Sequence, residues 1–327
     1  MVKTIKEIIG CTVTLVLIIA IIHKLGILVR PAYSGIVFNS VEVFHNLPED
    51  SVEVICYGSS HMWTGIDSMR MYEQYGVGIY NYGGNWQHIN TTELFFKDSL
   101  LTQSPKVILI DTYLVNELIQ DVDLNGEIYS VRKITESVAK QQYLRQCLGG
   151  DKERYLSYYV PLCAFHDNWI NFGQDFYLES VYDPGFASTM GYYRLNNRVE
   201  PITIPDVSTF EQEALSEEAI RILDEIVSIC KEEDIDIIFL TIPWGENFKY
   251  GDAMKEFAAQ NDCVYFNLFE YIEELGIDED TDFKDIGHLN PEGAVKVTDF
   301  LGEYIINNYD VTDMRTIEGN IWEQNLQ

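Results

Sequence analysis

The sequence predicts an α/β fold with a doubly wound parallel sheet, preceded by an apolar N-terminal helix. Five short runs rich in Val, Ile and aromatic residues alternate with longer helical patterns, which is typical of parallel sheets covered by helices on both faces. The chain has 327 residues, of which 46% are hydrophobic. It is long enough for one large α/β domain, or for a smaller one that carries an insertion.

The first 30 residues are expected to form a transmembrane signal-anchor. Ile8 to Ile22 carries no charge, and a second apolar patch, Leu25 to Val29, extends the run toward bilayer-spanning length. Lys3 and Lys6 precede the run, which favours a cytoplasmic N-terminus. A cleaved signal peptide is the alternative, but no small-x-small cleavage pattern follows the run. We therefore expect a single-pass protein of the cell membrane whose remainder lies outside the cytoplasm.

The main domain is expected over residues 51–327, after a short stalk or entry helix at 31–50. Short β-branched runs predict the strands at 52–57, 78–82, 106–111, 235–241 and 264–267. Helical periodicity predicts the helices at 68–75, 91–101, 216–233 and 292–304. A sheet of the flavodoxin-like, doubly wound kind accommodates this order of elements.

Residues 112–210, approximately, break the alternation and are interpreted as a helical insertion. It follows the C-terminal end of a strand, where ligands of open α/β sheets bind, so it is expected to form a lid or a substrate wall. Aromatic packing of a helical cap without ligand contact is the alternative. The aromatic and histidine residues concerned are Tyr155, Tyr158, Tyr159, Phe165, His166, Trp169, Phe176 and Tyr177.

Charge and cysteine content narrow the classes of partner. The formal net charge of −30 argues against nucleic-acid binding, because neutralising phosphates requires clustered Lys and Arg. The six cysteines form no CxxC pair and show no His-rich spacing, so no metal site is predicted. Cys147 and Cys163 are a candidate disulfide if that region is oxidising.

Gly58-Ser59-Ser60 directly follows the first predicted strand. A tight turn there can expose a serine hydroxyl and direct its backbone N–H at a developing oxyanion. A serine becomes a nucleophile when a histidine takes its proton and a carboxylate fixes that histidine's tautomer. The alternative for such a turn is that its serines only cap the following helix.

Asp285-Ile-Gly-His288 supplies an acid and a base near the other end of the chain. The three-residue spacing allows one short loop to present both side chains beside the C-terminal edge of the sheet. Asn290-Pro291 then begins the next helix as N-cap and first turn. We expect Ser60, His288 and Asp285 to converge.

These two blocks make the chain resemble the SGNH (GDSL-like) hydrolase superfamily. Gly58-Ser59-Ser60-His61 corresponds to the first family block, and Asp285-x-x-His288-Leu-Asn-Pro-x-Gly to the last. The resemblance implies Ser60 as nucleophile, His288 as general base and Asp285 as its orienting acid. With the N-terminal anchor, the chain looks most like membrane-anchored SGNH-like proteins of bacterial envelopes, which act in D-alanylation of teichoic acid or O-acetylation of polysaccharides.

The oxyanion hole departs from the family pattern. Asn81 begins the stretch that corresponds to the second block, and the usual glycine falls at Trp86, which leaves Gly84, Asn85 and Trp86 as candidate donors. The third block, Gly-x-Asn-Asp, is absent, and Asp111 stands in that region. Ser59, His61 and Gln87 complete the candidate oxyanion or substrate-binding residues.

The resulting hypothesis is a serine-dependent ester hydrolase or acyltransferase that acts through an acyl-Ser60 intermediate and needs no cofactor. The expected substrates are acylated cell-envelope carbohydrates or small esters, and a membrane-bound acyl donor is a conceivable partner. The alternative is a catalytically inactive SGNH scaffold that binds glycan or a membrane partner, which the departures in the second and third blocks favour.

Overall fold

The computed structural model describes residues 2–29, 35–118, 131–171, 188–195 and 199–326. Its centre is a five-stranded parallel sheet of order β2-β1-β3-β4-β5. The strands are β1 (Val54–Tyr57), β2 (Ile79–Asn81), β3 (Val107–Asp111), β4 (Asp236–Thr241) and β5 (Val264–Asn267). The predicted parallel α/β fold is confirmed, and the strand order is the flavodoxin-like one.

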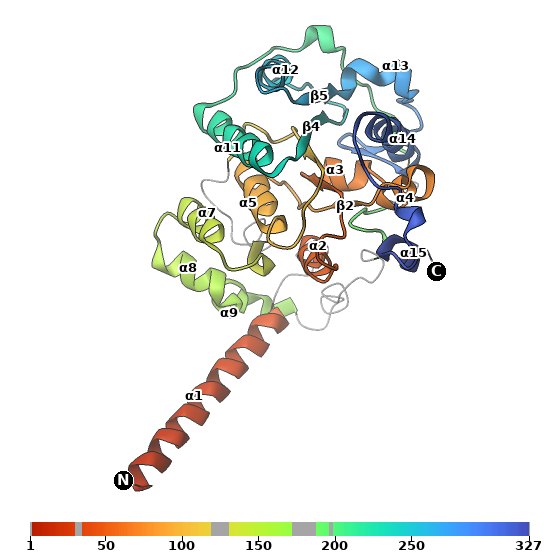
Figure 1. Cartoon of the computed structure of the whole chain (residues 1–327). Coiled ribbons are helices and arrows are strands. Elements are labelled where there is room, and N and C mark those ends of the chain that lie inside the picture. Colours follow the sequence, from red (N-terminus) through yellow and green to blue (C-terminus); the bar gives the residue numbers. More distant parts are fainter. Residues whose placement is uncertain (1, 30–34, 119–130, 172–187, 196–198, 327) are drawn as a thin grey trace.

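Helices cover both faces of the sheet (Figure 1). Side chains alternate along each strand, so that Ile55 packs toward one layer while Val54 and Cys56 pack toward the other. The first layer contains α2 (Gly35–His45), α5 (Ile89–Ser99), α11 (Glu217–Glu233) and α12 (Gly251–Gln260). The second contains α3 (Ser60–Gly65), α4 (Ser68–Tyr75) and α14 (Pro291–Asn308).

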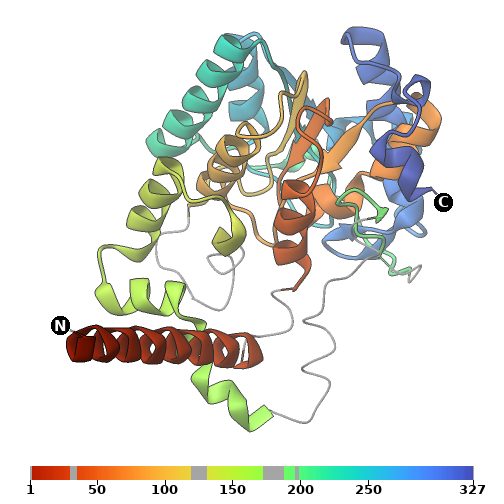
Figure 2. The ribbon, with the colours of Figure 1, turned by 60° about the horizontal axis from the view of Figure 1, so that its bottom comes forward.

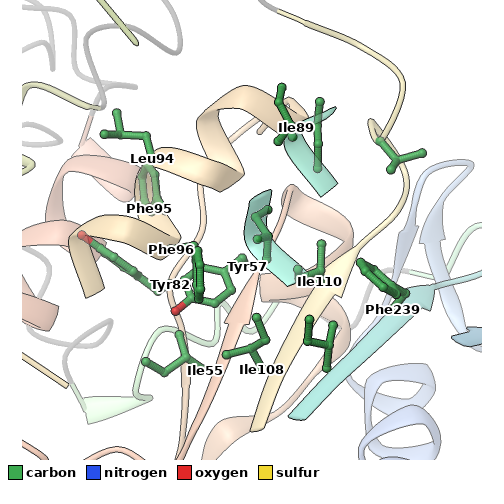
Figure 3. Packing of buried hydrophobic residues seen from close by; sticks show 14 of the residues in the cluster. Ile55, Tyr57, Tyr82, Ile89, Leu94, Phe95, Phe96, Ile108, Ile110 and Phe239 are labelled. Carbon is green, nitrogen blue, oxygen red and sulfur yellow. The ribbon is translucent and has the colours of Figure 1, made fainter. Parts of the chain in front are cut away.

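The larger core lies between α5 and the middle of the sheet. Figure 3 shows Phe96 of α5 above Ile55 and Ile108 of the strands, and Leu94 and Phe95 of the same helix further from them. All five side chains are at most 3% exposed. Burial on both faces explains why these strands read as nearly continuous apolar runs in the sequence.

The segment preceding β1 contains a helix that joins this core. Phe44 of α2 is fully buried and stacks on Tyr82, with ring centroids 4.0 Å apart. His45 lies 2.7 Å from the carboxylate of Asp98 on α5. Residues 31–50 were expected to form a stalk or an entry helix, and residues 35–45 are helical.

The helix boundaries follow capping signals. Asp67 caps α4 by accepting hydrogen bonds from two backbone N–H groups, and Gly76 ends it in the left-handed conformation at φ 74°. Ser216 caps α11 by accepting one hydrogen bond, from the backbone N–H of Ala219. α3 was not predicted, because six residues directly after a turn are too few for a periodic pattern.

The N-terminal helix α1 (Val2–Val29) projects away from the sheet (Figure 1). Thr4–Gly26 is long and apolar enough to cross a membrane, and none of that stretch's hydrophobic window is buried in the protein. Figure 2 shows that its C-terminal end lies against α9 (Pro161–Phe165). An apolar helix at this position could be an anchor or a signal sequence.

The described part of the insertion consists mainly of α7 (Val138–Leu148), α8 (Lys152–Tyr159), α9 and the short 3-10 helix η3 (His166–Asn171). Tyr158 and Phe165 are buried, whereas Trp169 is exposed. Phe176 and Tyr177 lie outside the described residues. Cys147 and Cys163 are both described and form no disulfide with each other, since Cys147 is buried in α7 and Cys163 is exposed in α9.

Candidate active site

The candidate site lies where the chain leaves the C-terminal ends of β1, β3 and β4. The strand order reverses between β1 and β3, and the crevice outside the strands at such a switch point is where open α/β sheets bind ligands. Ser60 follows β1 by three residues, Tyr113 follows β3 by two and Trp244 follows β4 by three. The topology therefore brings separate chain segments to one edge.

The turn after β1 depends on a close approach to β3. A Cβ on Gly58 would lie 2.2 Å from the Cβ of Asp111, so no larger residue fits without moving the backbone. Ser59 donates to the Asp111 carboxylate from both its N–H, at 3.1 Å, and its Oγ, at 2.6 Å. The Ser59 Oγ also accepts from the N–H of His61 and so caps α3. Ser59 is thereby fixed in the structure and leaves the neighbouring serine as the reactive candidate.

Ser60, His288 and Asp285 form one hydrogen-bonded series. The Ser60 Oγ lies 2.8 Å from His288 Nε2, and His288 Nδ1 lies 2.8 Å from Asp285 Oδ1. Because the carboxylate can only accept, Nδ1 carries the proton and Nε2 is left to accept from the serine hydroxyl. This arrangement of alcohol, imidazole and carboxylate is the one that nucleophilic serine catalysis requires.

Asp285 and His288 are held by a small hairpin that the sequence did not predict. β6 (Phe283–Asp285) and β7 (His288–Leu289) are antiparallel, and Asp285 pairs directly with His288. The N–H of Gly287 donates to Asp285 Oδ1 at 2.9 Å, and the N–H of Gly245 donates to the carbonyl of Ile286 at 2.8 Å. The second bond ties the hairpin to the loop after β4.

The helix after the hairpin begins as predicted. Asn290 caps α14 by accepting from the N–H groups of Glu292 and Gly293, and Pro291 is the first helical residue. The Asn290 side chain also donates to the carbonyl of Thr281 at 2.6 Å. The hairpin is therefore anchored on both sides.

The electrostatics keep Asp285 ionised. Partial burial opposes its ionisation, but the hydrogen bond and charge of His288, the Gly287 N–H and the Lys284 ammonium outweigh it, so the pKa of Asp285 is lowered. Lys284 lies 3.2 Å from Asp285 Oδ2, on the oxygen that His288 does not use. An ionised Asp285 stabilises the imidazolium that forms when His288 accepts a proton.

A cavity of about 300 Å³ opens onto this series. The other residues that line it are Ser59, His61, Trp86, Tyr113, Trp244, Glu246, Ile286 and Gly287. Those that were not expected from the sequence to belong to the site are Tyr113, Trp244, Glu246, Ile286 and Gly287. The positions of Tyr113 and Trp244 just past strand ends were the signal that could have found them.

The insertion at residues 112–210 was predicted to form a lid or a substrate wall, and one of its described residues lines the cavity. Tyr113 is the single residue between 112 and 210 that lines the cavity in the part of the chain that the structure describes. Its ring contacts those of His61 and Trp244. Residues 119–130 and 172–187, on which much of the prediction falls, lie outside the described residues.

His61 is a buried, neutral imidazole beside the nucleophile candidate. His61 is only 4% exposed, and its ring stacks on that of Tyr113 with 4.0 Å between the ring centroids. Burial, reinforced by the nearby His288 and partly opposed by Asp285, lowers the pKa of His61 to about 3. Its Nδ1 is buried and has no partner among the described residues.

The structure separates the candidate oxyanion donors. The N–H of Gly84 donates to the carbonyl of Gly58 at 3.2 Å and is therefore already used. Gln87 is buried beneath the loop and donates to Thr92 at 3.2 Å. In the described part of the chain, the N–H groups of Ser60, Asn85 and Trp86 donate to no protein acceptor, and of these residues Ser60 and Trp86 line the cavity.

Comparisons with known proteins leave the family open. A scan against protein-family models finds no match, and a search among curated proteins finds none either. Over the described residues, no cluster of three or more His, Cys, Asp or Glu side chains could hold a metal ion.

Proposed function

We propose that this protein is a serine-dependent ester hydrolase or acyltransferase of the SGNH type. The observation that carries the proposal is the hydrogen-bonded series from Ser60 through His288 to Asp285, with both contacts at 2.8 Å. A cavity that opens onto the serine provides room for a small acyl group and part of the alcohol. The flavodoxin-like sheet is compatible with the SGNH resemblance of the two sequence blocks.

In the proposed reaction His288 takes the proton of Ser60 while the serine oxygen attacks the ester carbonyl. The tetrahedral oxyanion accepts hydrogen bonds from backbone N–H groups, for which those of Ser60 and Trp86 are the candidates. Collapse of the intermediate expels the alcohol, which receives its proton from His288, and leaves an acyl group on Ser60. Water or a carbohydrate hydroxyl then takes the acyl group by the reverse sequence.

We further propose that α1 anchors the protein and that the site faces the extracytoplasmic side, where acylated envelope carbohydrates are the substrates. The support is the exposed apolar surface of α1 and the basic residues Lys3 and Lys6 at its start. An anchored enzyme would act on substrates within reach of the membrane, and a membrane-bound acyl donor fits that placement.

The test is hydrolysis of acetyl esters by the full chain purified in a mild detergent. Ser60→Ala removes the nucleophile and should abolish turnover, whereas Ser208→Ala, which removes an exposed serine outside the cavity, should retain it. Equal activity of the Ser60→Ala protein would reject the proposal. Glycan binding by a protein that hydrolyses nothing would favour the inactive scaffold instead.

A further inference from the structure

Trp86 is held in a backbone conformation that its side chain opposes. Its φ is +52°, in the left-handed region where a Cβ crowds the backbone and where a bulky residue is an outlier. The other non-glycine residues with positive φ in the described chain are three aspartates and Met190. Glycine would adopt this turn without strain. The indole is therefore present despite the backbone, not because of it.

The Trp86 ring also contributes little to the core. The residue is 64% exposed, while Trp244 in the same cavity is only 4% exposed. The indole stands at the mouth of the cavity, with its ring centroid 6.3 Å from that of Tyr113 and tilted by 43°. An exposed aromatic ring beside a nucleophile, kept at a cost in backbone strain, indicates contact with a ligand.

We propose that Trp86 is the residue that selects the alcohol part of the substrate, by stacking its indole face on a pyranose ring. The C–H groups on one face of a sugar ring pack on an aromatic plane, and its hydroxyl groups need acceptors at the edge. Glu246 supplies such an acceptor, because it is an exposed residue that lines the cavity. This inference rests on the proposed esterase or acyltransferase function.

An ammonium group is the other ligand that aromatic rings and a carboxylate can attract. Enclosure of a cation requires free ring faces on several sides. Tyr113 is stacked on His61 and meets Trp244 edge-on, so those rings are packed against one another, whereas Trp86 is 64% exposed. A single flat platform fits a ring that stacks on it. The sugar is therefore the better match to the observed exposure.

The experiment compares two acetyl esters that differ in the alcohol, methyl 6-O-acetyl-α-D-glucopyranoside and ethyl acetate, with the full chain in detergent. Trp86→Gly removes the indole but keeps the left-handed turn and its N–H. It should lower kcat/KM for the glucoside about 3- to 10-fold more than kcat/KM for ethyl acetate, and this additional loss should lie mainly in KM. The loss on the glucoside in Trp86→Phe should lie between that of the wild type and that of Trp86→Gly. Trp169→Gly removes a similarly exposed indole outside the cavity and should match the wild type on both esters.

Equal losses on both esters would show that only the backbone at Trp86 matters and would overturn the proposal, as would no loss on either. A selective loss with acetylcholine in place of the glucoside would assign the ring to a cation and overturn it too. A binding arm separates this result from failure of the proposed function. Ser60→Ala protein should bind the acetylated glucoside in ligand-observed NMR, and adding Trp86→Gly should remove that signal. Undiminished binding by the double variant would overturn the proposal even if the protein hydrolyses neither ester.

Discussion

Replacing His61 by phenylalanine should reduce the sensitivity of the protein to acid. The folded protein buries His61 as a neutral ring with a pKa of about 3, whereas an unfolded chain binds the proton near 6.5. Between these values the unfolded state holds one proton more, so the stability contributed by this group falls as the pH drops below 6.5. From pH 7.5 to pH 4.5 the loss amounts to about 2–3 kcal/mol.

The assay is urea unfolding of the full chain in detergent, followed by tryptophan fluorescence at the two pH values. Phenylalanine can keep the stacking on Tyr113 and carries no titratable group, so His61→Phe should lose about 2–3 kcal/mol less than the wild type on acidification. His166→Phe, which removes an exposed histidine, serves as the control and should follow the wild type. Identical losses in the wild type and His61→Phe would refute the view that His61 is buried and neutral.

Two further substitutions test the site and the turn beneath it. Asp285→Asn keeps the size of the side chain but removes its charge and introduces an amide N–H that can donate to His288 Nδ1 and so favours the wrong tautomer. Ester hydrolysis in a pH-stat should therefore fall about 10⁴-fold, and a loss below tenfold would contradict the assigned role. Gly58→Ala places a Cβ 2.2 Å from that of Asp111, so it should lower the free energy of unfolding by about 1–3 kcal/mol in urea melts, and unchanged stability would contradict the close approach.

Most strands and helices could be predicted from the sequence because the patterns that indicate them are local. The strand from Val107 to Asp111 is buried on both faces and reads as an uninterrupted apolar run. The helix that begins at Pro291 is indicated by its Asn290 cap and its apolar stripe. The short helix at Ser60–Gly65 and the hairpin around Asp285 and His288 were missed, since neither is long enough to display a period.

The candidate site was predictable where two features coincided, a reactive side chain and a position next to a strand end. The position of Ser60 after a strand predicted that it lies at the sheet edge, and the three-residue spacing predicted that His288 lies beside Asp285. In the structure Ser60 contacts His288, and His288 contacts Asp285. The sequence could not show that Asp111 holds Ser59, because that contact depends on the register between β1 and β3. Nor could the sequence show that the Gly84 N–H, a candidate oxyanion donor, already donates to Gly58, because that contact also depends on tertiary structure.

The central claim, that Ser60 is an activated nucleophile, is tested most directly by a fluorophosphonate probe and tandem mass spectrometry of the full chain. The probe should form one adduct, on the Ser60 side chain, and His288→Ala should slow its formation by at least about 10³-fold. An adduct on another residue, or equal labelling of wild type and His288→Ala, would contradict the claim.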